Sequence, residues 1–154
     1  MKIGGVLENH NLTLYRIMLM DDIPGAAGSI LKFFAQRNIN LEYITESTTT
    51  ENYGVMAVCI KNEFVEPVDR FIQENQNILE KFKIAKTENV STLGIYGPHF
   101  REKHSIAARF CTLLGAAGVN ILGMSSSISS VCCVIKSDVF VQGKEAVLKR
   151  FELP

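Results

Sequence analysis

The segment RNINLEYITES at residues 37–47 has a near copy eighty positions downstream, AGVNILGMSSS at residues 117–127. In each copy a helical pattern ends, one residue suited to left-handed backbone geometry follows, and an apolar strand-like run begins. Asn38 has that place in the first copy and Gly118 in the second, and these residue types tolerate the geometry best. The repeat predicts that one structural unit is written twice in this chain.

The first half of the chain alternates between strand and helix patterns. The run LTLYRIMLM at residues 12–20 is apolar on both alternating faces, which is typical of a central strand. A stripe of apolar residues at helical spacing follows and predicts a helix. The segments after it are expected to form two strands, a second helix with Val68 and Ile72 facing inward, and a fourth strand. The stripe consists of Ala27, Ile30, Leu31 and Phe34, and the later segments are 39–47, 53–61, 66–82 and 83–87. This β-α-β-β-α-β order indicates a ferredoxin-like unit.

The second half repeats this order after a shift of eighty residues. A strand is expected at 90–97, a helical stripe at Ala107, Phe110, Cys111 and Leu114, a second strand that begins with VNI at 119–121, a third strand in SSVCCVIKSD at 129–138 and a helix at 143–153. The sequence ends before a fourth strand, and we expect residues 2–7 to take that place. We therefore predict an α+β fold of two ferredoxin-like units, 8–86 and 87–154, with antiparallel sheets, helices on one face and a strand exchanged between units.

Composition narrows the classes of partner. With 47% hydrophobic and 21% charged residues and a mean hydropathy of +0.13, the chain has enough apolar surface for a packed core. Lys and Arg together number 16, as do Asp and Glu, so no basic excess favours nucleic acid. The start MKIGGVLENH lacks the apolar core of a signal peptide, and no apolar run reaches the length of a membrane span. We expect a cytoplasmic protein that binds neither nucleic acid nor membrane.

Catalytic and metal-binding patterns are missing from the sequence. His99 and His104 are five residues apart on an expected loop, without a Cys or carboxylate cluster at metal-ligand spacing. We identify no Ser-His-Asp or Cys-His constellation and no phosphate-binding glycine loop. The cysteines lie in apolar runs, where a thiol acts as a small hydrophobe; they are Cys59, Cys111, Cys132 and Cys133. We expect a protein that is not an enzyme and needs no metal or cofactor.

With these residues in view, the sequence resembles a tandem pair of ACT domains, most closely the C-terminal regulatory region of aspartate kinases. DDIPGAAGSILKFFAQRNINLEYI at 21–44 resembles the first unit of that family, in which D-x-P-G opens the helix. AARF at 107–110 and VNILGMSSSISSVCCVI at 119–135 resemble the second unit without a gap. The resemblance implies that an amino-acid effector binds where the loop before the first helix of one unit meets the second strand of another.

The residues of the expected ligand site follow from that resemblance and from local chemistry. A helix N-terminus holds a carboxylate through exposed backbone N–H groups, and Gly25 lets a ligand approach closely. Asp22 either accepts the ligand ammonium group or is only a helix cap, with Pro24 as an ordinary first-turn residue. Asn40 offers its backbone or is a structural asparagine. The expected ligand-binding residues are Asp22, Ile23, Pro24, Gly25, Ala26, Ala27, Ile39, Asn40, Glu46, Ser105, Val119, Asn120 and Ile121.

Two parts of the expected site depart from the family pattern. Glu46 stands where the resembled enzymes often carry Gln. Its carboxylate is solvated, paired within the protein or facing a ligand cation. Only the third state would favour a basic amino acid as the ligand. In the second unit EKHS at 102–105 replaces D-x-P-G, so we expect this site to be altered or lost and the unit to serve dimer packing. The serines at 125–127 either supply hydroxyls to a ligand or form a solvated strand end.

The sequence therefore predicts a non-catalytic sensor that binds a free amino acid between ACT units and acts as a homodimer. The alternative is a regulatory subunit of a hetero-oligomeric aspartate kinase, for which an enzyme chain would be the partner.

Overall fold

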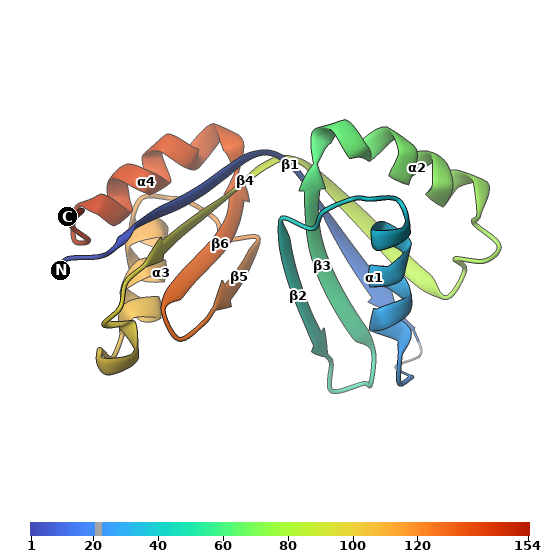
Figure 1. Ribbon diagram of the computed structural model, residues 1–154, viewed down its shortest axis with the longest axis horizontal. Helices are drawn as coiled ribbons and strands as arrows, with labels where there is room; N and C mark the ends of the chain where they lie inside the picture. The colour runs from blue at the N-terminus through green and yellow to red at the C-terminus, as the bar shows by residue number, and fades with distance from the viewer. Residues whose placement is uncertain (21–22) are drawn as a thin grey trace. The chain divides into compact units, whose positions relative to one another are not determined.

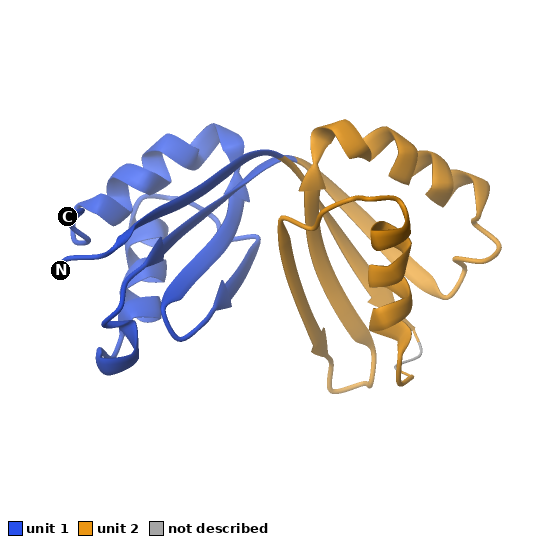
Figure 2. Ribbon diagram, in the orientation of Figure 1, with its two compact units in different colours: residues 1–11, 89–154 blue, residues 12–88 orange. Residues whose placement is uncertain are grey.

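The computed structural model describes residues 1–20 and 23–154, so Asp21 and Asp22 lie outside the described residues. The chain divides into two compact units (Figure 2). The first repeat consists of residues 12–88 and is unit 2 in Figure 2; the second repeat consists of residues 1–11 and 89–154 and is unit 1 there. Two long strands, β1 (Gly5–Leu19) and β4 (Phe82–Tyr96), contribute to both repeats.

The first repeat is a four-stranded sheet with two helices on one face (Figure 1). Its sheet order is β2-β3-β1-β4, in which β3 pairs antiparallel with both β1 and β2. This is the order of a ferredoxin-like unit. The other elements are α1 (Ala26–Gln36), β2 (Tyr43–Thr48), β3 (Gly54–Lys61), the 3-10 turn Asn62–Phe64 and α2 (Val65–Glu74).

The second repeat has the same order with β1 as its fourth strand, β1-β4-β6-β5. Its elements are the 3-10 turn Phe100–Glu102, α3 (Ile106–Ala116), β5 (Gly123–Ser126), β6 (Ser130–Lys136), the 3-10 turn Ser137–Val139 and α4 (Phe140–Leu148). The Ile3 amide donates to the Glu152 carbonyl at 2.9 Å and the Gly4 amide to the Tyr96 carbonyl at 2.7 Å. The N-terminal segment is therefore exchanged into the second repeat.

Several expected boundaries are wrong, among them the helix expected at 143–153, which is α4 at Phe140–Leu148. The strand expected at 39–47 begins only at Tyr43, because the amide of Ile39 still belongs to the end of α1. The helix expected at 66–82 ends at Glu74, where the Asn75 side chain donates to the Phe71 carbonyl and caps the last turn. The strands expected at 83–87 and 90–97 are one strand, β4.

The predicted helix ends are confirmed. Asn38 has φ 54° and Gly118 has φ 72°, both in the left-handed region. In each repeat the amide of this residue donates to the carbonyl three residues earlier. The amide of the next residue donates to the carbonyl five residues before it, and the two bonds together form a Schellman motif. The second of these bonds runs from Ile39 to Phe34 at 3.0 Å and from Val119 to Leu114 at 2.9 Å, and all four side chains are buried.

Each repeat has its own apolar core under its helices. In the first repeat Phe34 and Val68 pack on strand residues such as Met56, and in the second Phe110 and Phe151 are fully buried. Cys133 belongs to the core of the second repeat, and Cys59 is also fully buried. Burial raises the pKa of the Cys133 thiol to about 12, so this thiol stays protonated at neutral pH. Among the described helices none has the length and apolar character that crossing a bilayer requires.

Candidate functional site

The start of α1 is the first part of the expected site. Gly25 is the residue before the helix and has φ 88°, a conformation that glycine adopts at low cost. No side chain of the described residues caps this end, and a Cβ atom added at Gly25 or Gly28 would meet nothing within 4 Å. The amide of Ala26 donates to the Ile23 carbonyl at 3.2 Å. The amides of Ala27 and Gly28 have no carbonyl partner inside the helix, and neither donates to another described residue.

The segment after α1 is the second part. The amide of Ile39 is used in the helix end, and the amide of Glu42 donates to the Cys59 carbonyl at 2.8 Å. Between these two bonds, the backbone groups of Asn40 and Leu41 have no hydrogen bond to any described residue. Asn40 was expected on a strand, and it lies before β2 instead. Two consecutive residues therefore present backbone donors and acceptors, whereas Ile39, with a side chain 6% exposed, is part of the core.

The second repeat reproduces both parts. Ser105 precedes α3 with φ 71°, and no side chain of the described residues caps that helix start. After α3 the amide of Val119 is used in the helix end and that of Leu122 donates to the Val134 carbonyl at 2.8 Å. Asn120 and Ile121 between them have no hydrogen bond within the described part of the chain. The backbone geometry of both segments is thus present in each repeat.

The charges near the two helix starts differ. In the first repeat Ile23, Pro24 and Gly25 are exposed and uncharged. In the second repeat a cavity of about 480 Å³ adjoins the start of α3, and its lining consists of Met1, Lys103, His104, Ile106 and Arg109. Lys103, His104 and Arg109 are exposed and form no ion pair with any described residue. Lys103 and Arg109 therefore bring positive charge to this helix start.

Within one repeat the two parts of the site are not brought together. They lie at opposite ends of α1, which has 11 residues. At 1.5 Å per residue the helix separates them by about 16 Å, more than the head group of an amino acid spans. Figure 1 shows α1 running between these ends. The same separation holds for Ser105 and Asn120 around α3.

Glu46 lies on β2, the edge strand of the first repeat. It is opposite Met56 in the β2–β3 register, so its side chain is on the face that carries the helices. It is exposed, and no described residue forms an ion pair with it. Of the three states considered for this carboxylate, the structure shows solvation.

Two residues of these segments were not identified from the sequence, Gly28 and Leu41. A second glycine three positions after Gly25 keeps the first turn of α1 uncovered, and this spacing was a usable signal. Leu41 looks like an ordinary apolar strand residue, and only the hydrogen-bond pattern distinguishes it. In residues 1–20 and 23–154, no group of three His, Cys, Asp or Glu side chains could hold a metal ion.

In the part of the chain that the structure describes, each ferredoxin-like repeat has a helix start without a side-chain cap and two consecutive residues without backbone hydrogen bonds. A family model described as the ACT domain matches residues 15–79, which lie within the first repeat. The chain is therefore a small ACT-domain-containing protein.

Similar proteins extend the comparison over almost the whole chain. The sequence is 22% identical over 151 residues to an aspartokinase of Bacillus sp. (strain MGA3), covering 98% of this chain and 37% of that protein. It is 28% identical over 155 residues to a bifunctional aspartokinase/homoserine dehydrogenase of Buchnera aphidicola, covering 94% of this chain and 18% of that protein. The chain thus spans about a third or less of these relatives.

The tandem fold is also found in a solved structure of similar length. The ligand-free regulatory subunit of aspartate kinase from Thermus thermophilus superimposes with a TM-score of 0.82 at 18% identity, covering 97% of this chain and 99% of that one. At this identity the likeness concerns the fold. The chain thus shares the tandem fold of this regulatory subunit.

Proposed function

We propose that this protein is a non-catalytic sensor that binds a free amino acid through backbone groups of its ACT repeats. The observation that carries the proposal is a pair of backbone segments without hydrogen-bond partners among the described residues, the amides of Ala27 and Gly28 and the peptide groups of Asn40 and Leu41. An amino acid has a carboxylate for amide donors at a helix start and an ammonium group for carbonyl acceptors. Asp22, outside the described residues, is a further proposed acceptor for the ammonium group.

The ligand binds between units in this proposal. The helix start and the post-helix segment of one repeat are about 16 Å apart, so a single amino acid cannot contact both. One part must come from one repeat and the other part from a different repeat, in the same chain or in a second copy. We therefore propose a homodimer that completes sites of this kind. A monomer in light scattering at micromolar concentration would argue against it.

The two repeats have different ligand preferences in this proposal. The exposed carboxylate of Glu46, on the helix-bearing face of the first repeat, favours a ligand with a basic side chain such as lysine. The basic residues around Ser105 change the second helix start, so we propose that the second site is altered and that this repeat serves mainly in assembly. Equal calorimetric binding of lysine and leucine would contradict the role of Glu46.

The experiment is a thermal-shift screen of the twenty amino acids, because a ligand that binds only the folded state raises the melting temperature. The decisive variant is Gly28→Glu. The position is open, and a carboxylate in the first helical turn stabilises the helix while repelling the carboxylate of the ligand. We expect this variant to lose the shift.

The matched control is Gly28→Gln, which has the same size without the charge. It should keep most of the shift. If Gly28→Glu responds to the amino acid as strongly as Gly28→Gln, the helix start is not the carboxylate site. If no amino acid shifts the unmodified protein, the sensor proposal fails as a whole.

The second candidate function is that of a regulatory subunit in an aspartate kinase made of different chains. It is favoured by the match to the Thermus thermophilus regulatory subunit, which is covered almost completely. Purification of the tagged protein from its own host separates the two candidates. A stoichiometric kinase chain would support the subunit function, and a lone ligand-binding dimer would support the sensor. Both proposals place the protein in the cytoplasm.

A further inference from the structure

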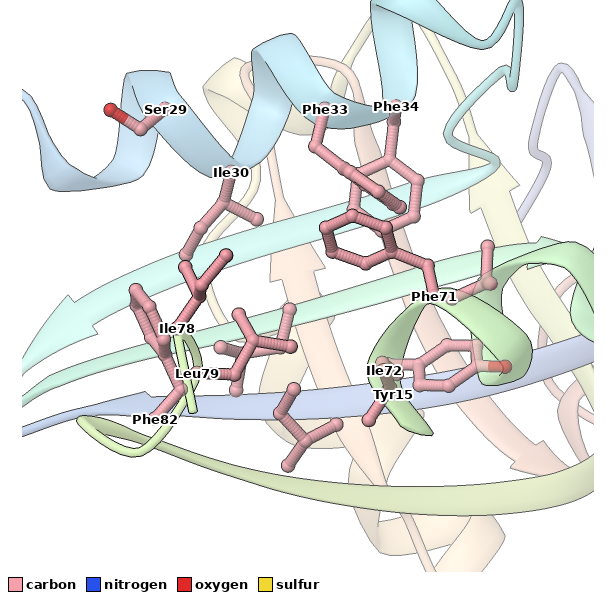
Figure 3. A pocket seen from close by; sticks show the side chains of 13 residues that line it. Tyr15, Ser29, Ile30, Phe33, Phe34, Phe71, Ile72, Ile78, Leu79 and Phe82 are labelled. Atoms are coloured by element: carbon pink, nitrogen blue, oxygen red, sulfur yellow. The ribbon is translucent and has the colours of Figure 1, made fainter. Parts of the chain in front are cut away.

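The first repeat contains an apolar cavity that the amino-acid proposal does not use. It has a volume of about 280 Å³ and lies between α1, α2, the turn that follows α2 and the sheet (Figure 3). In Figure 3, Ile30, Phe33 and Phe34 extend from α1 towards side chains from α2 and from the strands. The complete lining is Tyr15, Ile17, Ser29, Ile30, Phe33, Phe34, Val68, Phe71, Ile72, Ile78, Leu79, Phe82 and Ile84. No charged side chain is among these described lining residues.

The two hydroxyl groups in the lining are already hydrogen-bonded. Tyr15 donates to the Asp69 carboxylate at 2.7 Å, and Ser29 donates to the Gly25 carbonyl at 3.2 Å. The Asp69 carboxylate also accepts a hydrogen bond from Lys86 at 2.6 Å. The Tyr15 hydroxyl is thus held at this ion pair and does not donate to a ligand in the cavity. The described lining side chains therefore offer neither a charge nor an unsatisfied donor, and a charged ligand group among them would lose its hydration without compensation.

One end of the cavity is closed and the other is open. The rings of Phe33 and Phe71 lie 4.5 Å apart between centroids, and the Arg37 guanidinium lies 4.0 Å above the Phe33 ring, so α1 and α2 meet at this end. Towards the other end Ile78 is 72% exposed and Ser29 is exposed, which leaves an entrance. Aromatic rings of Tyr15, Phe33, Phe34, Phe71 and Phe82 line the space between.

The fold itself does not require this opening, because the second repeat of the same chain closes the corresponding space. The fourth and seventh residues of α2 are Val68 and Phe71, whereas in α4 they are Gly143 and Ala146. A Cβ atom added at Gly143 would lie 3.2 Å from a Leu114 methyl group, so α4 packs directly on α3. In the first repeat the larger residues of α2 leave lining side chains such as Ile30 and Ile72 only half-buried.

We propose that this cavity of the first repeat is a binding site for an uncharged aromatic small molecule with about two rings. A cavity of about 150 Å³ lined by apolar side chains stays dry and binds benzene, so a cavity of about 280 Å³ has room for a ligand nearly twice that size. The five aromatic side chains in the lining favour an aromatic ligand, because ring pairs stabilise each other in edge-to-face and offset arrangements. The site is distinct from the proposed amino-acid site, whose groups are backbone amides and carbonyls.

Indole is the probe, and the protein contains no tryptophan, so no indole group of the protein contributes to the emission. We expect a blue shift of its emission with saturable one-to-one binding to the full chain. In NMR we expect intermolecular NOEs from indole protons to the methyl groups of Ile30, Ile72 and Leu79. These NOEs locate the probe without any mutation.

The variant that fills the cavity is Ile30→Phe, since the residue eighty positions later on α3 is Phe110 and is fully buried. We expect it to weaken indole binding at least tenfold. Val141→Phe, at a position of α4 that is 67% exposed, is the matched control and should bind indole as the unmodified chain does. The proposal is overturned if indole does not bind at millimolar concentration, if its NOEs lie elsewhere, or if folded Ile30→Phe binds it equally well.

Discussion

Gly25 and Ser105, eighty positions apart, hold the same left-handed backbone conformation before the first helix of their repeats, with φ 88° and 71°. In both repeats the amide four residues later donates to the carbonyl of this residue, at 3.1 Å from Ser29 and 2.9 Å from Arg109. The geometry is therefore a property of the turn into the helix. Glycine adopts it without a steric cost, whereas serine does not.

Ser105→Gly should stabilise the protein. Relief of the left-handed strain contributes about 1–2 kcal/mol, and the greater freedom of glycine in the unfolded chain offsets about 0.5–1 kcal/mol of this. We expect a net gain of about 0.5–1 kcal/mol in the free energy of unfolding, measured by urea denaturation. Ser126→Gly, at an exposed strand position, is the control and should lower stability. A loss of stability in Ser105→Gly would show that the conformation carries no strain.

The exchange of the N-terminal strand depends on Gly4. A Cβ atom at this position would lie 2.7 Å from the Tyr96 ring, and the Gly4 amide is bonded to the Tyr96 carbonyl. We expect Gly4→Ala to destabilise the second repeat by about 1–3 kcal/mol through overpacking, with faster amide hydrogen exchange in β4 and β6.

The same substitution at Gly115 is the matched control for Gly4→Ala. Gly115 is inside α3 with nothing within 4 Å of an added Cβ atom, so alanine there should stabilise the helix by about 0.5–1 kcal/mol. Unchanged exchange rates in Gly4→Ala would mean that the N-terminal segment is not held as the structure has it.

The hydroxyl of Tyr15 should contribute measurably to the stability of the first repeat. The side chain is 1% exposed and donates to Asp69, and burial with this hydrogen bond raises its pKa well above the ordinary range. Tyr15→Phe removes the bond while Lys86 still pairs with Asp69, so we expect a loss of about 1 kcal/mol in urea denaturation.

Tyr96→Phe is the control for the Tyr15 variant. Tyr96 is 42% exposed, and its hydroxyl has no hydrogen bond to any described residue, so its removal should change stability little. Equal effects of the two variants would show that the Tyr15–Asp69 bond adds nothing to stability.

Glu8 should make the protein less stable in acid. Lys144 donates to its carboxylate and His10 lies 3.5 Å from it, and these partners hold the pKa of Glu8 below its ordinary value of 4.5. A folded-state pKa that is lowered gives stability above pH 4.5, and this stability is lost as the pH falls through the folded-state pKa. Urea denaturation between pH 3 and 6 should show a smaller loss in Glu8→Gln than in the unmodified protein.

Glu46→Gln is the matched control for the acid series, because Glu46 is exposed and unpaired among the described residues. It should leave the slope of stability against pH unchanged. If Glu8→Gln follows the unmodified protein as closely as this control does, the pairing of Glu8 with Lys144 has no effect on folding.

Element type and order were predictable from the sequence, whereas several element ends were not. Apolar periodicity gave the strands and helices, and the asparagine and glycine at 38 and 118 gave the helix ends. The end of α2 depended on a side-chain bond from Asn75, and the continuity of β4 depended on pairing with strands far away in the sequence. Local propensity contains neither kind of information.

For the candidate site, the sequence indicated the right segments but not which groups remain unsatisfied. The sequence placed both Ile39 and Asn40 at the start of the same expected strand. The amide of Ile39 is used in the helix end, whereas that of Asn40 has no partner within the described part of the chain. The apolar cavity was not foreseen at all. Its lining residues have ordinary helical and strand spacing, and the periodicity of a core face is the same whether the space beneath is filled or open.

The sequence by itself determined that two ferredoxin-like repeats form and where each first helix ends, because these features depend on local backbone preferences and on apolar periodicity. Only the tertiary structure decided which backbone groups have no partner among the described residues and how closely the helices of each repeat pack. Those outcomes depend on side-chain volumes that meet across distant segments, such as Phe71 against Phe33 in one repeat and Gly143 against Leu114 in the other.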